Sequence, residues 1–148
     1  MSNYKYFSFH NYLIMLRNTN TKLYHKDIYL PQDLINQAIH QQQNTTNFVF
    51  TKHLIERIEC KDRSHNSVTA EKIWNVLSKL KEKPIIPFEI ETENFNGKEK
   101  VTKYVVRDRC NMFEDISIVI RGNKVITAYI NNSTDEHFTL DSSKYSKF

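Results

Sequence analysis

Apolar residues in the first half of the chain recur every three or four positions, the period of a helix with one buried face. The first such stripe runs from Leu34 to Ile39, and Pro31 just before it suits the first residue of a helix. The polar run from 41 to 47 then predicts a linker.

Two further amphipathic helices are predicted between residues 48 and 83. The first runs from about Lys52 to Cys60, with Thr51 as its N-cap and Leu54, Ile55 and Ile58 on its buried face. The second is capped by Ser67 or Thr69 and is ended by Pro84 and Pro87. Its buried face is formed by Ile73, Trp74, Leu77 and Leu80.

The period changes to two after residue 87, which indicates strands. Residues 88–93 alternate, Asn96-Gly97 is a strong hairpin turn, and Val101 to Arg109 forms the return strand. Residues 116–121 and 124–131 form two more strands around Gly122. The sequence therefore predicts an α+β fold, with N-terminal helices packed on a four-stranded antiparallel sheet.

The length favours a single domain over residues 1–148. We divide it into an N-terminal helical and polar segment (1–47), two helices (48–83) and an antiparallel meander (86–140). No apolar run reaches the roughly twenty residues of a membrane span, and the two cysteines favour neither a disulfide scaffold nor a zinc site. We expect a cytoplasmic protein, in the host cytoplasm if a phage encodes it.

The number of glycines and the net charge exclude some classes of function and favour others. The only glycines are Gly97 and Gly122, so no glycine-rich phosphate loop exists, and P-loop NTPases, Rossmann dehydrogenases and kinases are excluded. The formal net charge is +4, and residues 51–83 carry eight basic and five acidic side chains. An anionic partner such as RNA is therefore favoured.

Neither a metal ion nor a cofactor is expected. The glutamates at 89, 91 and 93 share one strand face, which is typical of a solvated face or a guarded edge. No nucleophile elbow is present, which argues against a serine or cysteine hydrolase.

RNA cleavage by the ribose 2′-hydroxyl needs only a base, a cation and an acid. His53 and Arg57 lie one helical turn apart, and Arg107 and Arg109 project from one strand face. His137 follows the last strand. These residue types at these positions fit a metal-independent site.

The stretch from Phe50 to Ile58 contains Thr51, His53 and Arg57, and it resembles the S/T-x-H-x-x-x-R segment of the RegB-like and RelE-like small endoribonucleases. These enzymes belong to the barnase–EndoU–colicin–RelE group. The resemblance implies a RelE-like or microbial-RNase-like fold, with His53 in the active site. The family's second histidine is missing from the following helix, so either His137 or His65 takes its role, or the chemistry is weaker or lost.

Structural roles stay open for the same residues. In this alternative, His53 packs against the core or is capped by Glu56, and His137 lies on a surface loop. The two strand arginines form ion pairs with a nearby carboxylate, which is Asp108, Glu114 or Asp115.

We therefore predict a metal-independent endoribonuclease of phage or toxin type, with RNA as its partner and the ribosome or a host protein as a further one. The alternative is a non-catalytic phage factor that binds RNA or a host protein on a degenerate nuclease fold. The predicted catalytic residues are His53, Arg57, Arg107, Arg109, His137 and Tyr145, and the predicted RNA-binding residues are Lys52, Lys61, Arg63, Lys79, Lys103, Asn131 and Thr139.

Overall fold

The computed structural model describes residues 21–59 and 68–135. Within these ranges the chain forms three helices and six strands, which confirms the predicted α+β class. The elements in chain order are β1 (Thr21–His25), α2 (Gln32–Asn44), β2 (Val49–Phe50), α3 (Lys52–Glu59), α4 (Ala70–Leu77), β3 (Glu89–Phe95), β4 (Lys98–Arg109), β5 (Glu114–Arg121) and β6 (Lys124–Asn132).

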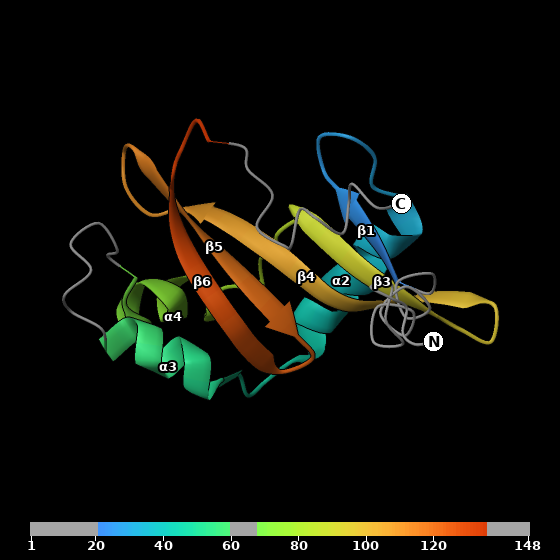
Figure 1. Cartoon of the computed structure of the whole chain (residues 1–148), viewed down its shortest axis with the longest axis horizontal. Helices are drawn as coiled ribbons and strands as arrows, with labels where there is room; N and C mark the ends of the chain where they lie inside the picture. The colour runs from blue at the N-terminus through green and yellow to red at the C-terminus, as the bar shows by residue number, and fades with distance from the viewer. Residues whose placement is uncertain (1–20, 60–67, 136–148) are drawn as a thin grey trace, which may run out of the picture.

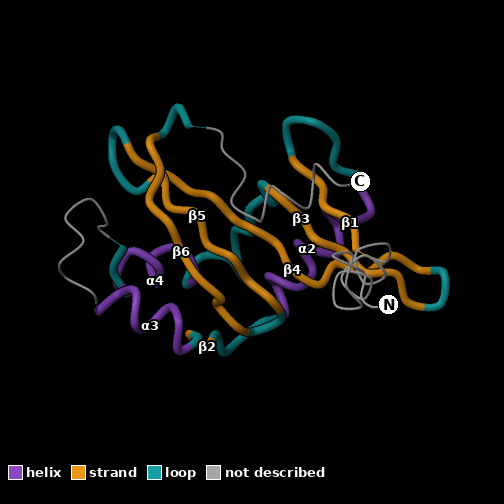
Figure 2. The backbone as a smooth tube through the Cα atoms, viewed as in Figure 1, coloured by secondary structure: helices purple, strands orange, loops and turns teal. Residues whose placement is uncertain are grey.

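The six described strands form one sheet in the order β1-β3-β4-β5-β6-β2 (Figure 2). All neighbouring strands are antiparallel except β2, which pairs with β6 in parallel. The predicted meander forms the centre, but the prediction of four strands is wrong because β1 and β2 add one strand at each edge. The two residues of β2 are too few to show a period.

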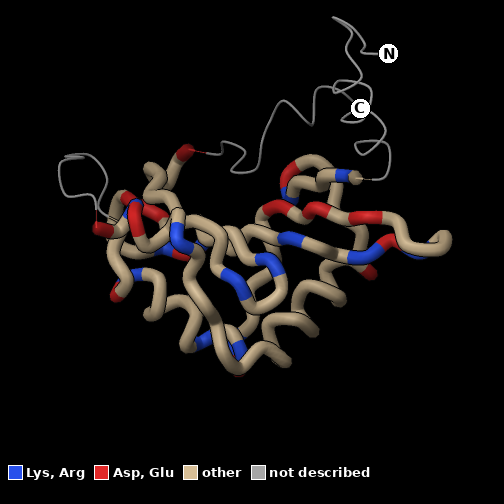
Figure 3. The backbone as a smooth tube through the Cα atoms, turned by 60° about the horizontal axis from the view of Figure 1, so that its bottom comes forward, with Lys and Arg blue, Asp and Glu red and all other residues tan. Residues whose placement is uncertain are grey.

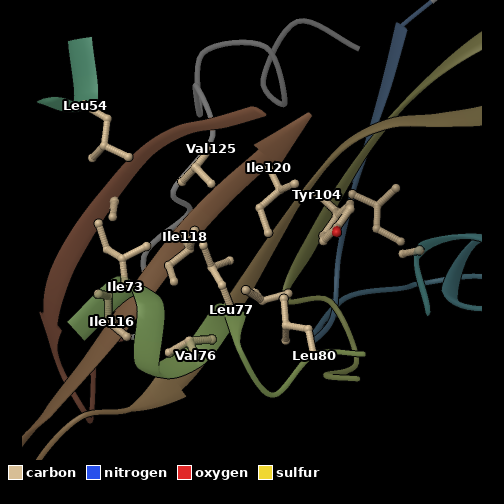
Figure 4. Close-up of a cluster of buried hydrophobic side chains, with 14 of the residues drawn as sticks. Leu54, Ile73, Val76, Leu77, Leu80, Tyr104, Ile116, Ile118, Ile120 and Val125 are labelled. Carbon is tan, nitrogen blue, oxygen red and sulfur yellow. The ribbon is translucent and has the colours of Figure 1, made fainter. Parts of the chain in front are cut away.

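The helices pack on one side of the sheet (Figure 3). In Figure 1, α2 lies behind β3 and β4, and α3 lies beside β6. Their buried side chains meet alternate residues of the strands to form the main core (Figure 4). The core includes Leu54 of α3, Ile73, Val76 and Leu77 of α4, and Tyr104, Ile116, Ile118 and Ile120 of the sheet.

The helix boundaries differ from the predicted ones at two places. Helix α2 continues through Asn44, into the run predicted to be a linker, because Gln42 is fully buried and bonded. Its Nε2 donates to the Ile85 carbonyl at 2.8 Å, and its Oε1 accepts from the Ile85 amide at 2.8 Å. Helix α4 begins after Thr69, as predicted, but ends at Leu77, well before Pro84.

Two tight turns connect the central strands. Asn96 and Gly97 between β3 and β4 have φ of 53° and 81°, and Gly122 between β5 and β6 has φ of 62°. Left-handed backbone of this kind favours glycine and asparagine. Both predicted hairpins are therefore confirmed.

The opposite face of the sheet, here called the helix-free face, carries no described helix. Arg107 of β4, Ser117 of β5 and Tyr129 of β6 are register partners and lie in one row across it. Val105 and Val119 form a small apolar cluster on the same face. No helix among the described residues is long and apolar enough to cross a membrane.

Candidate nucleic-acid interface

Two arginines at the end of β4 share one carboxylate. Arg107 and Arg109 alternate with Asp108 and therefore project to the same face. Arg107 Nε lies 3.0 Å from Asp115 Oδ2, and Arg109 Nε lies 2.7 Å from Asp115 Oδ1. Of the ion-pair partners that the sequence left open, Asp115 is the one that the structure shows.

The two arginines differ in their freedom to bind a ligand. The side chain of Arg107 is 8% exposed, donates Nη2 to the Asn132 carbonyl at 3.1 Å, and lies 5.0 Å from the centre of the Phe88 ring. The side chain of Arg109 is 59% exposed. Arg107 therefore acts within the fold, whereas Arg109 presents a cation to the surface.

Arg109 also lines a pocket between α4 and the end of β4, here called the cation pocket, of about 390 Å³. Lys79 follows α4 and lines the same pocket, so the structure brings together two residues predicted for catalysis and RNA binding. Burial raises the pKa of the Cys110 thiol, and the nearby Lys72 acts in the opposite direction. The described residues that line the cation pocket are Lys72, Asn75, Val76, Ser78, Lys79, Asp108, Arg109 and Cys110.

A second pocket, here called the turn pocket, lies beside the β4–β5 turn and has a volume of about 540 Å³. It includes Asn131, another predicted RNA-binding residue. Met112 and Phe113 at the turn are 76% and 68% exposed. The described residues that line it are Asn111, Met112, Phe113, Glu114, Ile130, Asn131 and Asn132.

Helix α3 holds the other predicted residues at the edge of the sheet. Lys52 and His53 are exposed on its first turn. Arg57 donates Nε to the Ala128 carbonyl of β6 at 3.0 Å, and its guanidinium lies 4.6 Å from the centre of the Tyr129 ring. Arg57 thereby covers part of the β6 edge that the short β2 leaves unpaired.

The described structure does not join these two groups of residues. Among residues 21–59 and 68–135, no hydrogen bond, ion pair or ring contact connects His53 to Arg107 or Arg109. Arg109 and Lys79 line one pocket, whereas Arg57 contacts Tyr129, which lies in the same row of the sheet as Arg107.

The glutamates of β3 are not on a solvated face or at an edge. Glu89 and Glu91 are 0% and 4% exposed, and β1 pairs with β3, which makes β3 an interior strand. Lys103 Nζ, predicted to bind RNA, lies 3.8 Å from Glu91 Oε2. Lys103 is therefore engaged within the sheet.

His25 is a candidate functional residue that the sequence pattern did not indicate. It is 4% exposed, and its ring meets Phe88 edge-on at 4.6 Å between centres. Burial lowers the pKa of His25; the Asp27 carboxylate opposes this shift and Arg107 adds to it. No period marks the segment around His25 as a strand, so the pattern gave no signal.

Five of the predicted site residues, and His65 as the alternative second histidine, lie outside the described ranges. No cluster of three metal-ligating side chains occurs within residues 21–59 and 68–135. No protein-family model, no curated protein and no solved structure matches this chain. The residues outside the described ranges are Lys61, Arg63, His65, His137, Thr139 and Tyr145.

Proposed function

We propose that this protein binds RNA through the cation pocket. The observation that supports this is that Lys79 and Arg109, which belong to separate parts of the fold, both line one pocket. The described residues that line it include three basic residues and a single acidic one, Asp108, and the guanidinium of Arg109 is also paired with Asp115. Lysine and arginine side chains grouped in this way attract phosphate groups.

Single-stranded RNA fits this surface better than a small anion does. Proteins that bind single strands combine cations for the backbone with aromatic side chains on which bases stack. Here the exposed Phe113 belongs to the turn that follows Arg109, and Arg109 Nη1 donates to the Met112 carbonyl at 3.5 Å. The resemblance to RelE-like and microbial RNases, in fold and in RNA as ligand, forms part of this proposal.

Cleavage of the bound RNA is the second candidate function. The observation that favours it is the exposed imidazole of His53, one turn before Arg57 on α3. A neutral imidazole accepts the 2′-hydroxyl proton as the 2′-oxygen attacks phosphorus, and a guanidinium stabilises the charged phosphorane. The P–O5′ bond then breaks, and the leaving 5′-oxygen takes a proton from the imidazolium or from water. This reaction needs no metal ion and leaves a 2′,3′-cyclic phosphate.

Binding is tested by fluorescence anisotropy with a labelled single-stranded RNA over a series of salt concentrations. The double variant Lys79→Ala/Arg109→Ala is expected to bind at least tenfold more weakly. Loss of two phosphate contacts lowers the slope of log affinity against log salt by about 1.4. Lys98→Ala/Lys100→Ala, which removes two exposed lysines from the other end of β4, is the matched control. Equal losses in both double variants contradict the proposed pocket.

Cleavage is tested separately, with the same RNA incubated in EDTA. We expect products with 2′,3′-cyclic phosphate ends that disappear in His53→Ala and persist in His40→Ala. His40 is an exposed histidine on α2 and serves as the control. Intact RNA after prolonged incubation with folded protein would leave binding as the function.

A further inference from the structure

We propose that His25 is a pH-sensitive switch of the β1–α2 turn: its neutral imidazole holds the turn closed, and protonation of the imidazole releases it. The β1–α2 turn, residues 25–29, is the first part of the loop between β1 and α2 in Figure 1. The inference does not depend on RNA binding. Histidine is the side chain that changes charge closest to neutral pH, so it is the residue type that such a switch needs.

The protonation state of His25 follows from one hydrogen bond. The Asp27 amide donates to His25 Nδ1 at 3.0 Å. An amide N–H can only donate, so Nδ1 carries a lone pair and the proton of the neutral ring is on Nε2. A protonated imidazole has N–H groups on both nitrogens and no acceptor. The bond from the Asp27 amide therefore exists only while His25 is neutral.

Hydrogen bonds, rather than buried side chains, hold the β1–α2 turn. The His25 carbonyl accepts from the Ile28 amide at 3.1 Å and from the Tyr29 amide at 2.9 Å. The Ile28 and Tyr29 side chains are 74% and 64% exposed, so they bury little apolar surface. The Tyr29 ring meets the Tyr24 ring edge-on, with 6.3 Å between centres. A segment with few buried apolar contacts opens locally at a small cost in free energy.

Protonation makes the closed turn unfavourable. His25 is 4% exposed, and its ring packs edge-on against Phe88. Once Nδ1 carries a proton, its N–H faces the N–H of Asp27 in a place from which water is largely excluded. The amide then lacks an acceptor, and the imidazolium lacks hydration. Both costs fall when the turn opens and the ring reaches solvent.

Charged groups from three elements decide the pH of this change. The Asp27 carboxylate, on the turn itself, favours the protonated ring, whereas burial and Arg107 of β4 favour the neutral ring. Burial is the largest of these effects, so the pKa of His25 is lowered. Glu89 of β3, the register partner of His25, is fully buried, and its carboxylate when ionised acts in the same direction as Asp27. The switch therefore operates below about pH 6.5.

Asparagine at position 25 separates the closed turn from the titration. Its side-chain oxygen accepts from the amide two residues further on, as in an Asx turn, and the group does not titrate between pH 5 and 8. His25→Asn should therefore keep the turn closed throughout this range. His40→Asn makes the same substitution at an exposed position of α2 and serves as the matched control.

The test is amide hydrogen exchange of the full chain, followed by NMR between pH 5 and 8 and corrected for the intrinsic pH dependence of exchange. We expect the protection of the Asp27 amide to fall at least tenfold on acidification, with the same midpoint as the His25 imidazole. The fall should be absent in His25→Asn and present in His40→Asn. Asp27→Asn removes a carboxylate that favours protonation, so it should move both midpoints to lower pH.

The comparison of midpoints in the unmodified protein needs no variant, so it decides the proposal even if His25→Asn does not fold. Different midpoints for the His25 ring and the Asp27 amide overturn the switch, and so does an equal loss of protection in His25→Asn. The Ile118 amide of β5 separates local opening from unfolding of the whole sheet. Its protection should persist to pH 5, and its loss together with that of Asp27 contradicts a switch confined to the turn.

Discussion

Replacement of Asp115 by asparagine removes the one carboxylate that both β4 arginines share. The Arg107 and Asp115 side chains are 8% and 13% exposed, so solvent screens their attraction only weakly. Breaking a buried ion pair by removing one partner destabilises a protein by about 3–5 kcal/mol. Arg107 keeps its bond to the Asn132 carbonyl, and an asparagine oxygen can accept one bond from the arginines. We therefore expect Asp115→Asn to lower the free energy of unfolding by about 2–3 kcal/mol.

Two other variants serve as controls, because both should lose much less stability. Arg109→Ala breaks the exposed half of the same cluster, and exposed pairs contribute about 0–1 kcal/mol. Asp108→Asn makes the same charge change between the two arginines in the sequence, and among the described residues the Asp108 carboxylate accepts only from the Arg109 amide. Both variants should lose less than about 1 kcal/mol of stability.

The assay is urea unfolding followed by the fluorescence of Trp74. This is the only tryptophan of the chain, and it stacks on Phe50 with 5.1 Å between ring centres. The variants should share one slope of free energy against urea, so that a shift in midpoint reports stability. The reasoning is refuted if Arg109→Ala is as destabilising as Asp115→Asn, or if Asp115→Asn behaves like Asp108→Asn.

Three other predictions concern stability. Because burial lowers the pKa of His25, the unfolded chain binds a proton more readily than the folded protein does. The free energy of unfolding should therefore fall as the pH drops below about 6.5. Urea titrations between pH 5 and 8 should show a weaker pH dependence in His25→Gln. The buried Tyr104 hydroxyl has no hydrogen-bond partner among the described residues, so Tyr104→Phe should raise the urea midpoint or leave it unchanged. In Gly122→Ala the added Cβ meets no atom within 4 Å, but an alanine at φ of 62° is strained. Calorimetry should show a loss of stability of about 1–2 kcal/mol.

The sequence predicted the turns and helix ends that depend on interactions between neighbouring residues of the chain. Asn96-Gly97 and Gly122 marked both hairpins because a positive φ is a property of the residue itself. Of the two predicted caps of α4, Ser67 and Thr69, the structure shows Thr69, whose side chain accepts from the Lys72 amide three residues on. The alternation in β4 also assigned Arg107 and Arg109 to one face.

What depended on distant parts of the chain was not predicted. Gln42 reads as polar linker, yet it is buried because the backbone of Ile85 supplies both of its hydrogen-bond partners. Glu89 was predicted to be solvated, yet it is fully buried, in a strand that β1 makes interior to the sheet. The cation pocket likewise forms only when the end of α4 packs beside the end of β4, and no spacing between Lys79 and Arg109 reveals this.

The position of Arg57 on the edge of β6 has a consequence for self-association. An unpaired strand edge can accept a strand of another molecule and start aggregation. Thr51, just before α3, and Arg57 of α3 donate to the carbonyls of Ile126 and Ala128 on this edge, so these two side chains hinder such pairing. Loss of the Arg57 side chain exposes this edge, and the protein would then extend its sheet into oligomers.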